Sequence, residues 1–270
     1  MSALYPEEAA RAALAVHPVP LLFVSVCGAH LYGFPSPDSD LDLRGVHVLP
    51  VRAALALKRP GETVERTETV QGVAIDLVTH DVRKFLELAV VKRSGNPLEA
   101  LFSPLPVQGD PRRRELAALV QPCLTSEHAA HYRGFARREH ARFVARPTLK
   151  RALYVYRVAL TGVHLLRTGA VLPHLPTLAD LYGLPHLYSW IAAKAAGEEK
   201  GTATESVRTR TEEDYPHLVE LLAEALEHTV LPVEPSAEAV RAVEEYLVSM
   251  RLHGSLERET KPPMNADSRR

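Results

Sequence analysis

Two aspartates spaced two positions apart, Asp40 and Asp42, have the clearest potential for chemistry in this chain. They open a stretch of alternating apolar residues, Leu41–Leu49, that is typical of a strand. Side chains of a strand alternate between its two faces, so Asp40, Asp42 and Arg44 share one face and the leucines take the other. Neighbouring carboxylates repel each other and are costly to desolvate, so they require a cation. A hard divalent ion with oxygen ligands, Mg²⁺ before Mn²⁺, is the natural candidate.

A glycine turn lies upstream of this pair. The apolar run Leu21–Val26 predicts a buried strand that stops just before Gly28. A backbone without a Cβ can approach a bound group closely at such a position. A glycine turn suited to phosphates beside a carboxylate pair predicts a site for a nucleoside triphosphate. The ordinary alternative is an Asp-rich turn before an exposed strand, but such a turn does not require Asp42 and Arg44 to share a face.

Two short motifs in this region resemble those of a known family. Gly28–Gly33 reads Gly-Ala-His-Leu-Tyr-Gly, and Ser39–Gly45 reads Ser-Asp-Leu-Asp-Leu-Arg-Gly. Together they resemble the signature of the DNA polymerase β-type nucleotidyltransferases, and within these the RNA-repair-pathway DNA polymerase beta family. The sharp resemblance covers Val24–Val48. A looser one continues through Asp76, Gly95–Glu99 and a helical segment that carries Lys150 and Arg157.

The resemblance implies an enzyme that moves a nucleoside monophosphate from a nucleoside triphosphate to an acceptor hydroxyl and releases pyrophosphate. Asp40 and Asp42 would bridge two Mg²⁺ or Mn²⁺ ions, and Asp76 would be the third catalytic, metal-binding carboxylate. For Asp76, a structural salt bridge or a chemically silent edge position is the alternative. The serine that usually follows the first glycine is replaced by Ala29, so its hydroxyl is absent while the backbone N–H groups remain.

The resemblance also implies which residues hold the nucleotide. Lys150, Tyr154 and Arg157 fall at i, i+4 and i+7 on one helix face, and the family places a lysine and an arginine there to hold the triphosphate. His30 lies between the motif glycines, where contact with phosphate and a purely structural role are equally good interpretations. The complete expected nucleotide-binding set is Gly28, Ala29, His30, Ser39, Arg44, Lys150, Tyr154 and Arg157.

The resemblance suggests an RNA end, for repair or end modification, as the acceptor, and Arg137, Arg138 and Arg142 are the candidates for holding it. A solvated charged face is the ordinary alternative for each arginine. Two further functions stay open from the sequence. One is the same chemistry on a small-molecule or protein hydroxyl, and the other is a nucleotide-binding regulatory module without turnover.

Composition limits the partners. The 270 residues carry a net charge of −1 with a pI near 6.9, so a polyanion must be met by local patches. The two cysteines, Cys27 and Cys123, do not predict a disulfide framework. No histidine or cysteine spacing indicates zinc, no apolar run approaches membrane length, and the acidic N-terminus is unlike a signal peptide. We therefore expect a cytoplasmic protein that binds neither zinc nor a membrane.

Hydrophobic periodicity predicts strands in the first part of the chain and helices in the second, an α+β order. Together with the resemblance, this order suits a small mixed-sheet nucleotidyltransferase core at 1–110 and an all-helical domain at 111–253 that closes a cleft over it. A disordered tail is expected at 254–270 and a loop or mobile linker at Glu198–Thr204. Glu99 is expected to complement the helix dipole from the first turn of a helix, with a functional role as the alternative. The expected strands are Leu21–Val26, Leu41–Leu49, Thr63–Val70, Val73–Thr79 and Leu105–Gln108. The expected helices are Pro6–Val16, one starting after Asp81, and then Pro111–Val120, Glu127–Val144, Pro147–Arg167, Thr177–Ala196, Glu212–His228 and Ala237–Leu252.

Overall fold

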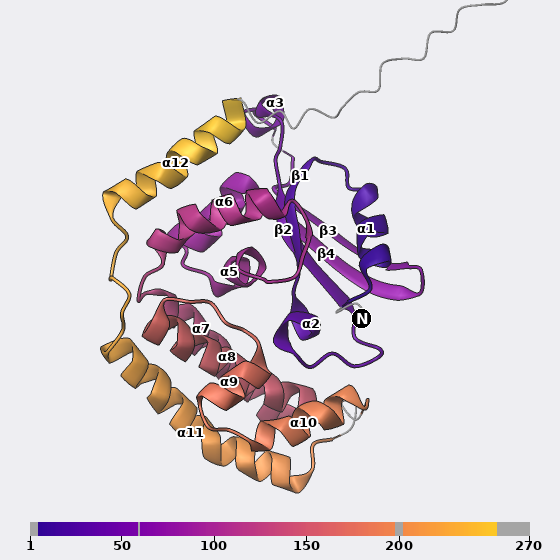
Figure 1. Ribbon diagram of the computed structural model, residues 1–270, viewed down its shortest axis with the longest axis vertical. Helices are drawn as coiled ribbons and strands as arrows, with labels where there is room; N and C mark the ends of the chain where they lie inside the picture. Colours follow the sequence, from indigo (N-terminus) through magenta and orange to yellow (C-terminus); the bar gives the residue numbers. More distant parts are fainter. Residues whose placement is uncertain (1–4, 59, 198–201, 253–270) are drawn as a thin grey trace, which may run out of the picture.

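The computed structural model describes residues 5–58, 60–197 and 202–252. Its strands are β1 (Leu21–Val26), β2 (Leu41–His47), β3 (Thr63–Val70), β4 (Val73–Asp81) and β5 (Pro106–Gln108). They form one mixed sheet in the order β3-β4-β2-β1-β5 (Figure 1). Only β2 and β4 pair in parallel, and the other neighbours are antiparallel. All five predicted strands are confirmed.

The alternation of side chains decides which helices cover each face of the sheet. Leu41, Leu43 and Ile75 point to the face covered by α1 (Glu7–Ala15). Phe23 and Val46 point to the opposite face and join the larger core. The elements on that side and at the end of the sheet are α3 (Val51–Ala54), α4 (Val82–Leu86), η1 (Glu87–Val91), α5 (Gly95–Leu101), α6 (Asp110–Val120) and η2 (Gln121–Cys123).

Two local signals act as the sequence predicts. Gln71 and Gly72 both have positive φ, +51° and +79°, which is the backbone twist required by a two-residue hairpin between β3 and β4. Asp81 ends β4 and caps α4, because its carboxylate accepts a hydrogen bond from the backbone N–H of Arg83 at 3.1 Å.

The second half of the chain is a helical bundle around α8 (Leu149–Thr168), of whose 20 residues 14 are buried. Thr148 caps its first turn and Gly169, at φ +74°, ends it. The helices packed against α8 are α7 (His128–Ala145), α9 (Leu175–Leu181), α10 (His186–Ala195) and α11 (Glu205–Glu227). The predicted fold class, a mixed-sheet core followed by helices, is confirmed.

Two helix predictions in this half are wrong in their bounds. The single helix expected over Thr177–Ala196 is interrupted after α9, where Gly183 has φ +67° and Pro185 precedes α10. α11 begins seven residues before the expected Glu212, because the hydroxyl of Thr204 accepts from the N–H of Val207 and caps it. The expected tail and residues 198–201 of the expected loop lie outside the described residues.

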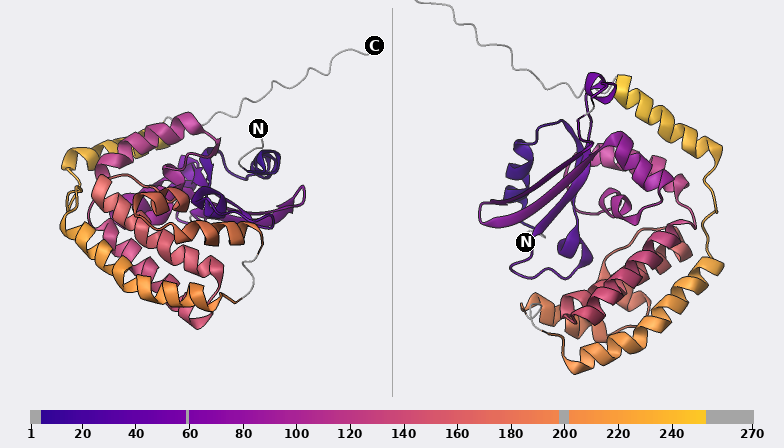
Figure 2. Two further views of the ribbon diagram at one scale, coloured as in Figure 1. Left: turned by 60° about the horizontal axis from the view of Figure 1, so that its bottom comes forward. Right: turned by 180° about the vertical axis from the view of Figure 1, so that it is seen from behind.

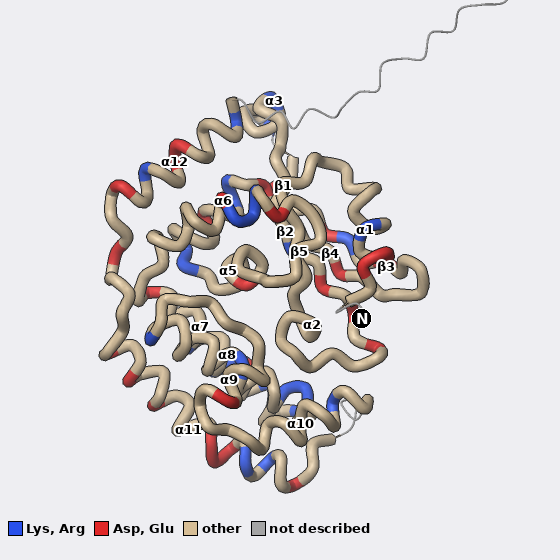
Figure 3. The backbone as a smooth tube through the Cα atoms, in the orientation of Figure 1, with Lys and Arg blue, Asp and Glu red and all other residues tan. Residues whose placement is uncertain are grey.

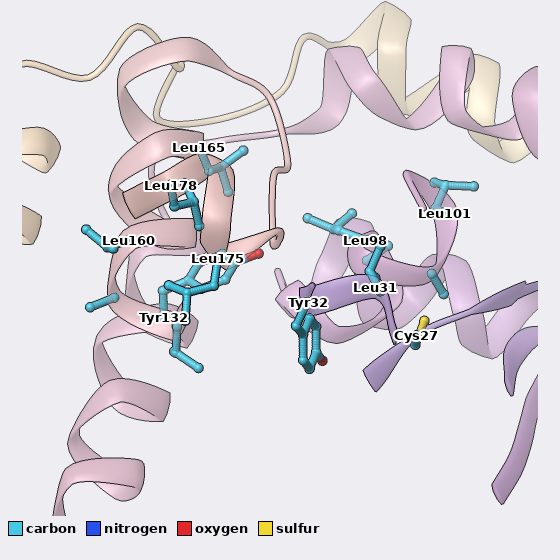
Figure 4. Packing of buried hydrophobic residues seen from close by; sticks show 14 of the residues in the cluster. Cys27, Leu31, Tyr32, Leu98, Leu101, Tyr132, Leu160, Leu165, Leu175 and Leu178 are labelled. Atoms are coloured by element: carbon cyan, nitrogen blue, oxygen red, sulfur yellow. The ribbon is translucent and has the colours of Figure 1, made fainter. Parts of the chain in front are cut away.

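The last helix, α12 (Ala237–Leu252), returns from the bundle to the sheet (Figure 2). It packs against α6 and α4, and the Arg251 guanidinium donates to the Asp81 carboxylate and to the Leu49 carbonyl. α6 and α12, which follow the expected domain boundary near residue 110, therefore pack beside the sheet. Buried apolar residues continue from Tyr32 and Leu98 toward the bundle (Figure 4). The boundary itself stays a prediction.

Candidate active site

Asp42 and Asp76 are register partners on the parallel strands β2 and β4. Directly paired residues of neighbouring strands point to the same face of a sheet, so the two carboxylates stand side by side. Their side chains are 27% and 39% exposed, which leaves both accessible to a ligand. Asp40 immediately precedes β2 and is exposed. The structure therefore brings together Asp42 and Asp76, 34 positions apart in the chain, with Asp40 at the start of the same strand.

Arg44 bridges the two carboxylates. Its Nη2 donates to Oδ1 of Asp42 at 2.9 Å and to Oδ2 of Asp76 at 2.7 Å, and its Nη1 donates to the Asp76 carbonyl at 2.6 Å. Burial raises the pKa of Asp42, the Arg44 charge opposes this rise, and the carboxylates of Asp76 and Asp40 add to it. The acidic face thus needs a cation, and Arg44 provides one.

The donor set on this face suits a hard divalent cation, because its accessible atoms are carboxylate oxygens. Asp42 and Asp76 would have to exchange the Arg44 guanidinium for the ion. Within the described residues no group of three His, Cys, Asp or Glu side chains is already gathered as a metal site.

The glycine turn lies directly against this face. Cys27 ends the first strand region with its N–H donating to the Asp42 carbonyl at 2.8 Å. Gly28 follows with φ +61° and begins α2 (Gly28–Tyr32), which ends at Gly33 in the left-handed region. The side chain of Ala29 is buried and belongs to the hydrophobic core. A serine at that position would accordingly direct its hydroxyl into packed surroundings in this structure.

His30 and Ser39 line an open pocket of about 770 Å³ beside the acidic face. Pro35 and Pro37 of the loop after α2 and Ala74 of β4 contribute apolar surface to it. Burial and the nearby Lys194 charge lower the pKa of His30. The Ser39 hydroxyl accepts from the N–H of Ser36 at 2.9 Å, which fixes the loop that leads into Asp40. The pocket is large enough for a nucleoside.

The helix α8 faces the carboxylates with its first two turns. Lys150 is exposed, and its charge opposes the rise that burial causes in the pKa of Asp42. Burial raises the pKa of Tyr154 to about 12, and the Asp42 carboxylate adds to the rise. The two side chains therefore lie near Asp42, as their expected place in the nucleotide site requires.

Arg157, the third residue of that helix face, is fully buried. Its Nη1 donates to Oε1 of Glu99 at 2.7 Å, and its guanidinium lies 3.9 Å from the centre of the Tyr32 ring. The Tyr32 hydroxyl donates to Oε2 of Glu99 at 2.7 Å. Arg157 thus lies beneath the glycine turn and does not reach the surface that a triphosphate would contact. We assign it a positioning role.

Glu99 is a residue of this site to which the sequence interpretation gave a functional role only as the alternative. It was expected in the first turn of a helix, complementing the dipole, and this expectation is wrong, because α5 begins at Gly95 and has no acidic residue in its first turn. Glu99 is 4% exposed and joins α5 to α8 and α2. A lone glutamate in an otherwise apolar helix was the available signal, since buried carboxylates are rare unless paired.

The three arginines expected to hold an acceptor do not converge. Arg142 pairs with Glu139 at 2.7 Å, and the guanidinium of Arg138 lies 5.6 Å from the centre of the Phe135 ring. Arg137 instead lines a groove with Arg133 on another side of α7.

A model of the RNA repair pathway DNA polymerase beta family matches residues 7–249. The chain belongs to this family. It is therefore a nucleotidyltransferase of the DNA polymerase β type, as the two motifs predicted. No curated protein matches it.

Among solved structures, a nucleotidyltransferase-like protein from Exiguobacterium sibiricum 255-15 is similar in part. It shares 12% identity over 90% of this chain and 75% of that chain, with a TM-score of 0.31. A likeness this distant carries no argument about mechanism. No helix of the described residues is long and apolar enough to cross a membrane.

Proposed function

We propose that this family member transfers a nucleoside monophosphate from a nucleoside triphosphate to the hydroxyl of an RNA end, with Mg²⁺ or Mn²⁺ bound. The observation that carries the proposal is the in-register pair Asp42 and Asp76 beside the Gly28 turn. The acceptor hydroxyl would give its proton to solvent, and its oxygen would form a bond to the α-phosphorus. The bond between the α-phosphorus and the α–β bridging oxygen would break, and pyrophosphate would leave with that electron pair.

The carboxylates of Asp40, Asp42 and Asp76 would hold two ions. Bound ions of this kind neutralise the triphosphate and lower the pKa of the attacking hydroxyl. Arg44, released from Asp42 and Asp76 by that exchange, would remain on the same strand face as a donor for phosphate oxygens. Lys150 would meet the phosphates from α8, and the backbone N–H groups of the turn would meet them from the other side.

The nucleoside would occupy the pocket lined by His30 and Ser39. Its proline-rich loop offers apolar surface for a base and its hydroxyl and imidazole groups can bond the sugar or base edge. Tyr154, whose ring is held against Tyr32 and Phe34, would close the side nearest Asp42. The family description and the arginine-rich helix α7 support RNA as the acceptor class.

The test incubates the purified protein with each radiolabelled triphosphate, Mg²⁺ or Mn²⁺, and one acceptor class at a time: RNA ends, a protein mixture, or small hydroxyl compounds. Label on RNA together with released pyrophosphate is the expected result. Label on protein or on a small molecule would show that the acceptor is not RNA. Tight nucleotide binding without turnover would show that the protein is a nucleotide-binding regulatory module and not an enzyme.

Asp40→Asn and Asp42→Asn should each lower the rate by roughly 100-fold or more, because each removes a ligand worth several kcal/mol in the transition state. Glu65→Gln is the matched control. Glu65 is an exposed carboxylate on β3, register partner of Val78 and so on the same sheet face as Asp76, outside the proposed site. Wild-type rates in both Asn variants would contradict the proposal that the acidic face holds the catalytic ions.

A further inference from the structure

A second hollow lies on the helical half, away from the acidic face. It has a volume of about 390 Å³ and lies between α7, α8 and α11. α11 is on the outer side of the bundle and the sheet is on the other side of α8 (Figures 1 and 2). Ala130, Gly134 and Ala159 form its small-residue floor, and Arg133, Arg137 and Tyr215 stand along it. We call these six residues the α7 groove.

The α7 groove carries two uncompensated positive charges. Arg133 and Arg137 are exposed and one helical turn apart, so their side chains lie on the same side of α7. Neither forms an ion pair or a hydrogen bond with any residue in the described part of the chain. α7 holds four arginines against one glutamate, and that glutamate, Glu139, pairs with Arg142 instead. Figure 3 shows the basic residues on α7 and α8. These two arginines favour an anionic ligand on the α7 side of the groove, whereas α11 on the other side is rich in acidic residues.

The walls of the groove also include an aromatic ring and an open floor of small residues, which the ligand has to fit. Tyr215 is fixed, because its ring stacks on His140 with 3.6 Å between centroids and 1° between planes. Burial raises the pKa of Tyr215 and the Arg137 charge opposes the rise, so ring and cation lie close together. The missing side chain of Gly134 keeps the floor open, since a Cβ there would meet only the Arg138 guanidinium, at 3.4 Å.

Two cations beside an aromatic ring and an apolar floor match the chemistry of one nucleotide unit, with a phosphate on the arginines and a base on the apolar side. The volume falls within the range of small-ligand sites. We infer that the α7 groove binds a nucleotide of a single-stranded RNA, upstream of the end that reacts. The inference rests on the proposed function for the identity of the acceptor, and it adds a second anchoring point on the far side of α8.

A remote anchor of this kind has a kinetic signature. Binding energy from parts of the substrate distant from the reacting atoms acts only on acceptors long enough to reach it. Arg133→Ala/Arg137→Ala should therefore raise KM for a long RNA acceptor by about tenfold while leaving KM for a mononucleoside acceptor and for the triphosphate unchanged.

The decisive measurement is equilibrium binding of a fluorescent single-stranded RNA of about 20 nucleotides, longer than typical single-strand sites, without triphosphate or metal. The double arginine variant should bind at least about tenfold more weakly at moderate salt, and the slope of log K against log salt should fall by about 1 to 2. Arg241→Ala is the control, since Arg241 is an exposed arginine on α12, outside the groove.

Gly134→Leu tests the groove itself, because it keeps both arginines and fills the floor. Glycine in a helix interior is unfavourable, so this variant should fold at least as well as the wild type. It should also lose RNA affinity. Full RNA binding by Gly134→Leu, or by the double arginine variant, would overturn the inference, as would equal competition by an acidic peptide. Absence of all nucleotidyl transfer by the wild type would instead overturn the proposed function, and the binding measurement would still decide the groove.

Discussion

The carboxylate of Asp42 occupies the space that a side chain on Gly28 would need. A Cβ on Gly28 would lie 1.8 Å from Oδ2 of Asp42, far inside van der Waals contact, and the residue has φ +61° as well. The glycine turn and the acidic face are therefore one unit, in which the turn backbone approaches the acid as closely as atoms allow.

Gly28→Ala should destabilise the protein and abolish transfer. It adds left-handed strain of about 1–2 kcal/mol to a clash that can be relieved only by moving Asp42 from its place. Gly183→Ala is the matched control, because Gly183 has φ +67°, a Cβ there would meet no atom within 4 Å, and the residue lies between α9 and α10, outside the pocket beside the acidic face. Urea unfolding should show a larger loss for Gly28→Ala, and activity should be lost only there. Equal losses in both variants would mean that Asp42 does not constrain the turn.

The buried pair of Arg157 and Glu99 makes a second prediction. Removing one partner leaves an uncompensated buried charge, so Arg157→Met or Glu99→Met should each cost about 3–5 kcal/mol of unfolding free energy. The double variant should recover much of the sum, because apolar side chains of similar volume can replace a buried pair. Urea unfolding of the four proteins gives the coupling energy.

The double variant also tests the role of Arg157. If the residue only positions Tyr32 and the turn, a stable double variant should keep a near-normal KM for the triphosphate. A folded double variant with KM raised tenfold or more would show that Arg157 contacts the nucleotide directly, and the positioning role would be withdrawn.

Much of the fold was predictable because its signals are local. The alternation in Leu41–Leu49 and in Val73–Thr79, the cap at Asp81 and the turn at Gln71 each depend on neighbours in sequence. The break before α10 was missed because Gly183 lies inside a segment whose apolar pattern continues on both sides of it. The early start of α11 was missed because it depends on the cap by Thr204, which the sequence interpretation placed at the end of a loop.

The site was predictable only in part, for a related reason. Asp40 and Asp42 share a face by spacing alone, but the meeting of Asp42 with Asp76 depends on the parallel pairing of β2 and β4. The bridge made by Arg44 and the pair between Glu99 and Arg157 follow from tertiary packing across 32 and 58 positions. Helix spacing placed Arg157 on the same face as Lys150, but it could not show that this part of the face is buried.

His47 gives the stability a pH dependence. It is buried on β2 with its Nδ1 2.9 Å from the Thr79 hydroxyl, and burial lowers its pKa from 6.5 to about 4. Between those pH values the unfolded chain binds more protons than the folded protein. The free energy of unfolding should therefore fall as the pH falls through this window, by at most about 3 kcal/mol from this group.

Replacing His47 with Gln should flatten that dependence, measured by urea unfolding at about pH 7 and about pH 4.5. Part of the slope should remain, because burial also lowers the pKa of His17 and of His80. His217→Gln, an exposed position on α11, is the control. An unchanged slope in His47→Gln would assign the acid sensitivity to other groups.

Lys150 lies at a position where the helix dipole disfavours a positively charged side chain. It lies in the first turn of α8, at the positive end of the helix dipole. It has no carboxylate partner within the described residues, and its charge acts on Asp42. Lys150→Ala should raise KM for the triphosphate by about tenfold or more, because a charge-assisted hydrogen bond contributes about 1.5–3 kcal/mol. Unfolding free energy should stay level or rise slightly.

The neighbouring residue supplies the control for Lys150. Arg151 donates to the carbonyls of Arg142 and Arg146 at 2.8 and 2.9 Å, so Arg151→Ala should weaken the junction of α7 and α8 without changing KM. Steady-state kinetics with a fixed acceptor, together with urea unfolding of both variants, separate the two effects. If Lys150→Ala left KM for the triphosphate unchanged, or if Arg151→Ala raised that KM equally, the first turn of α8 would not belong to the donor site. The phosphates would then have to be held by Arg44 and the turn backbone alone.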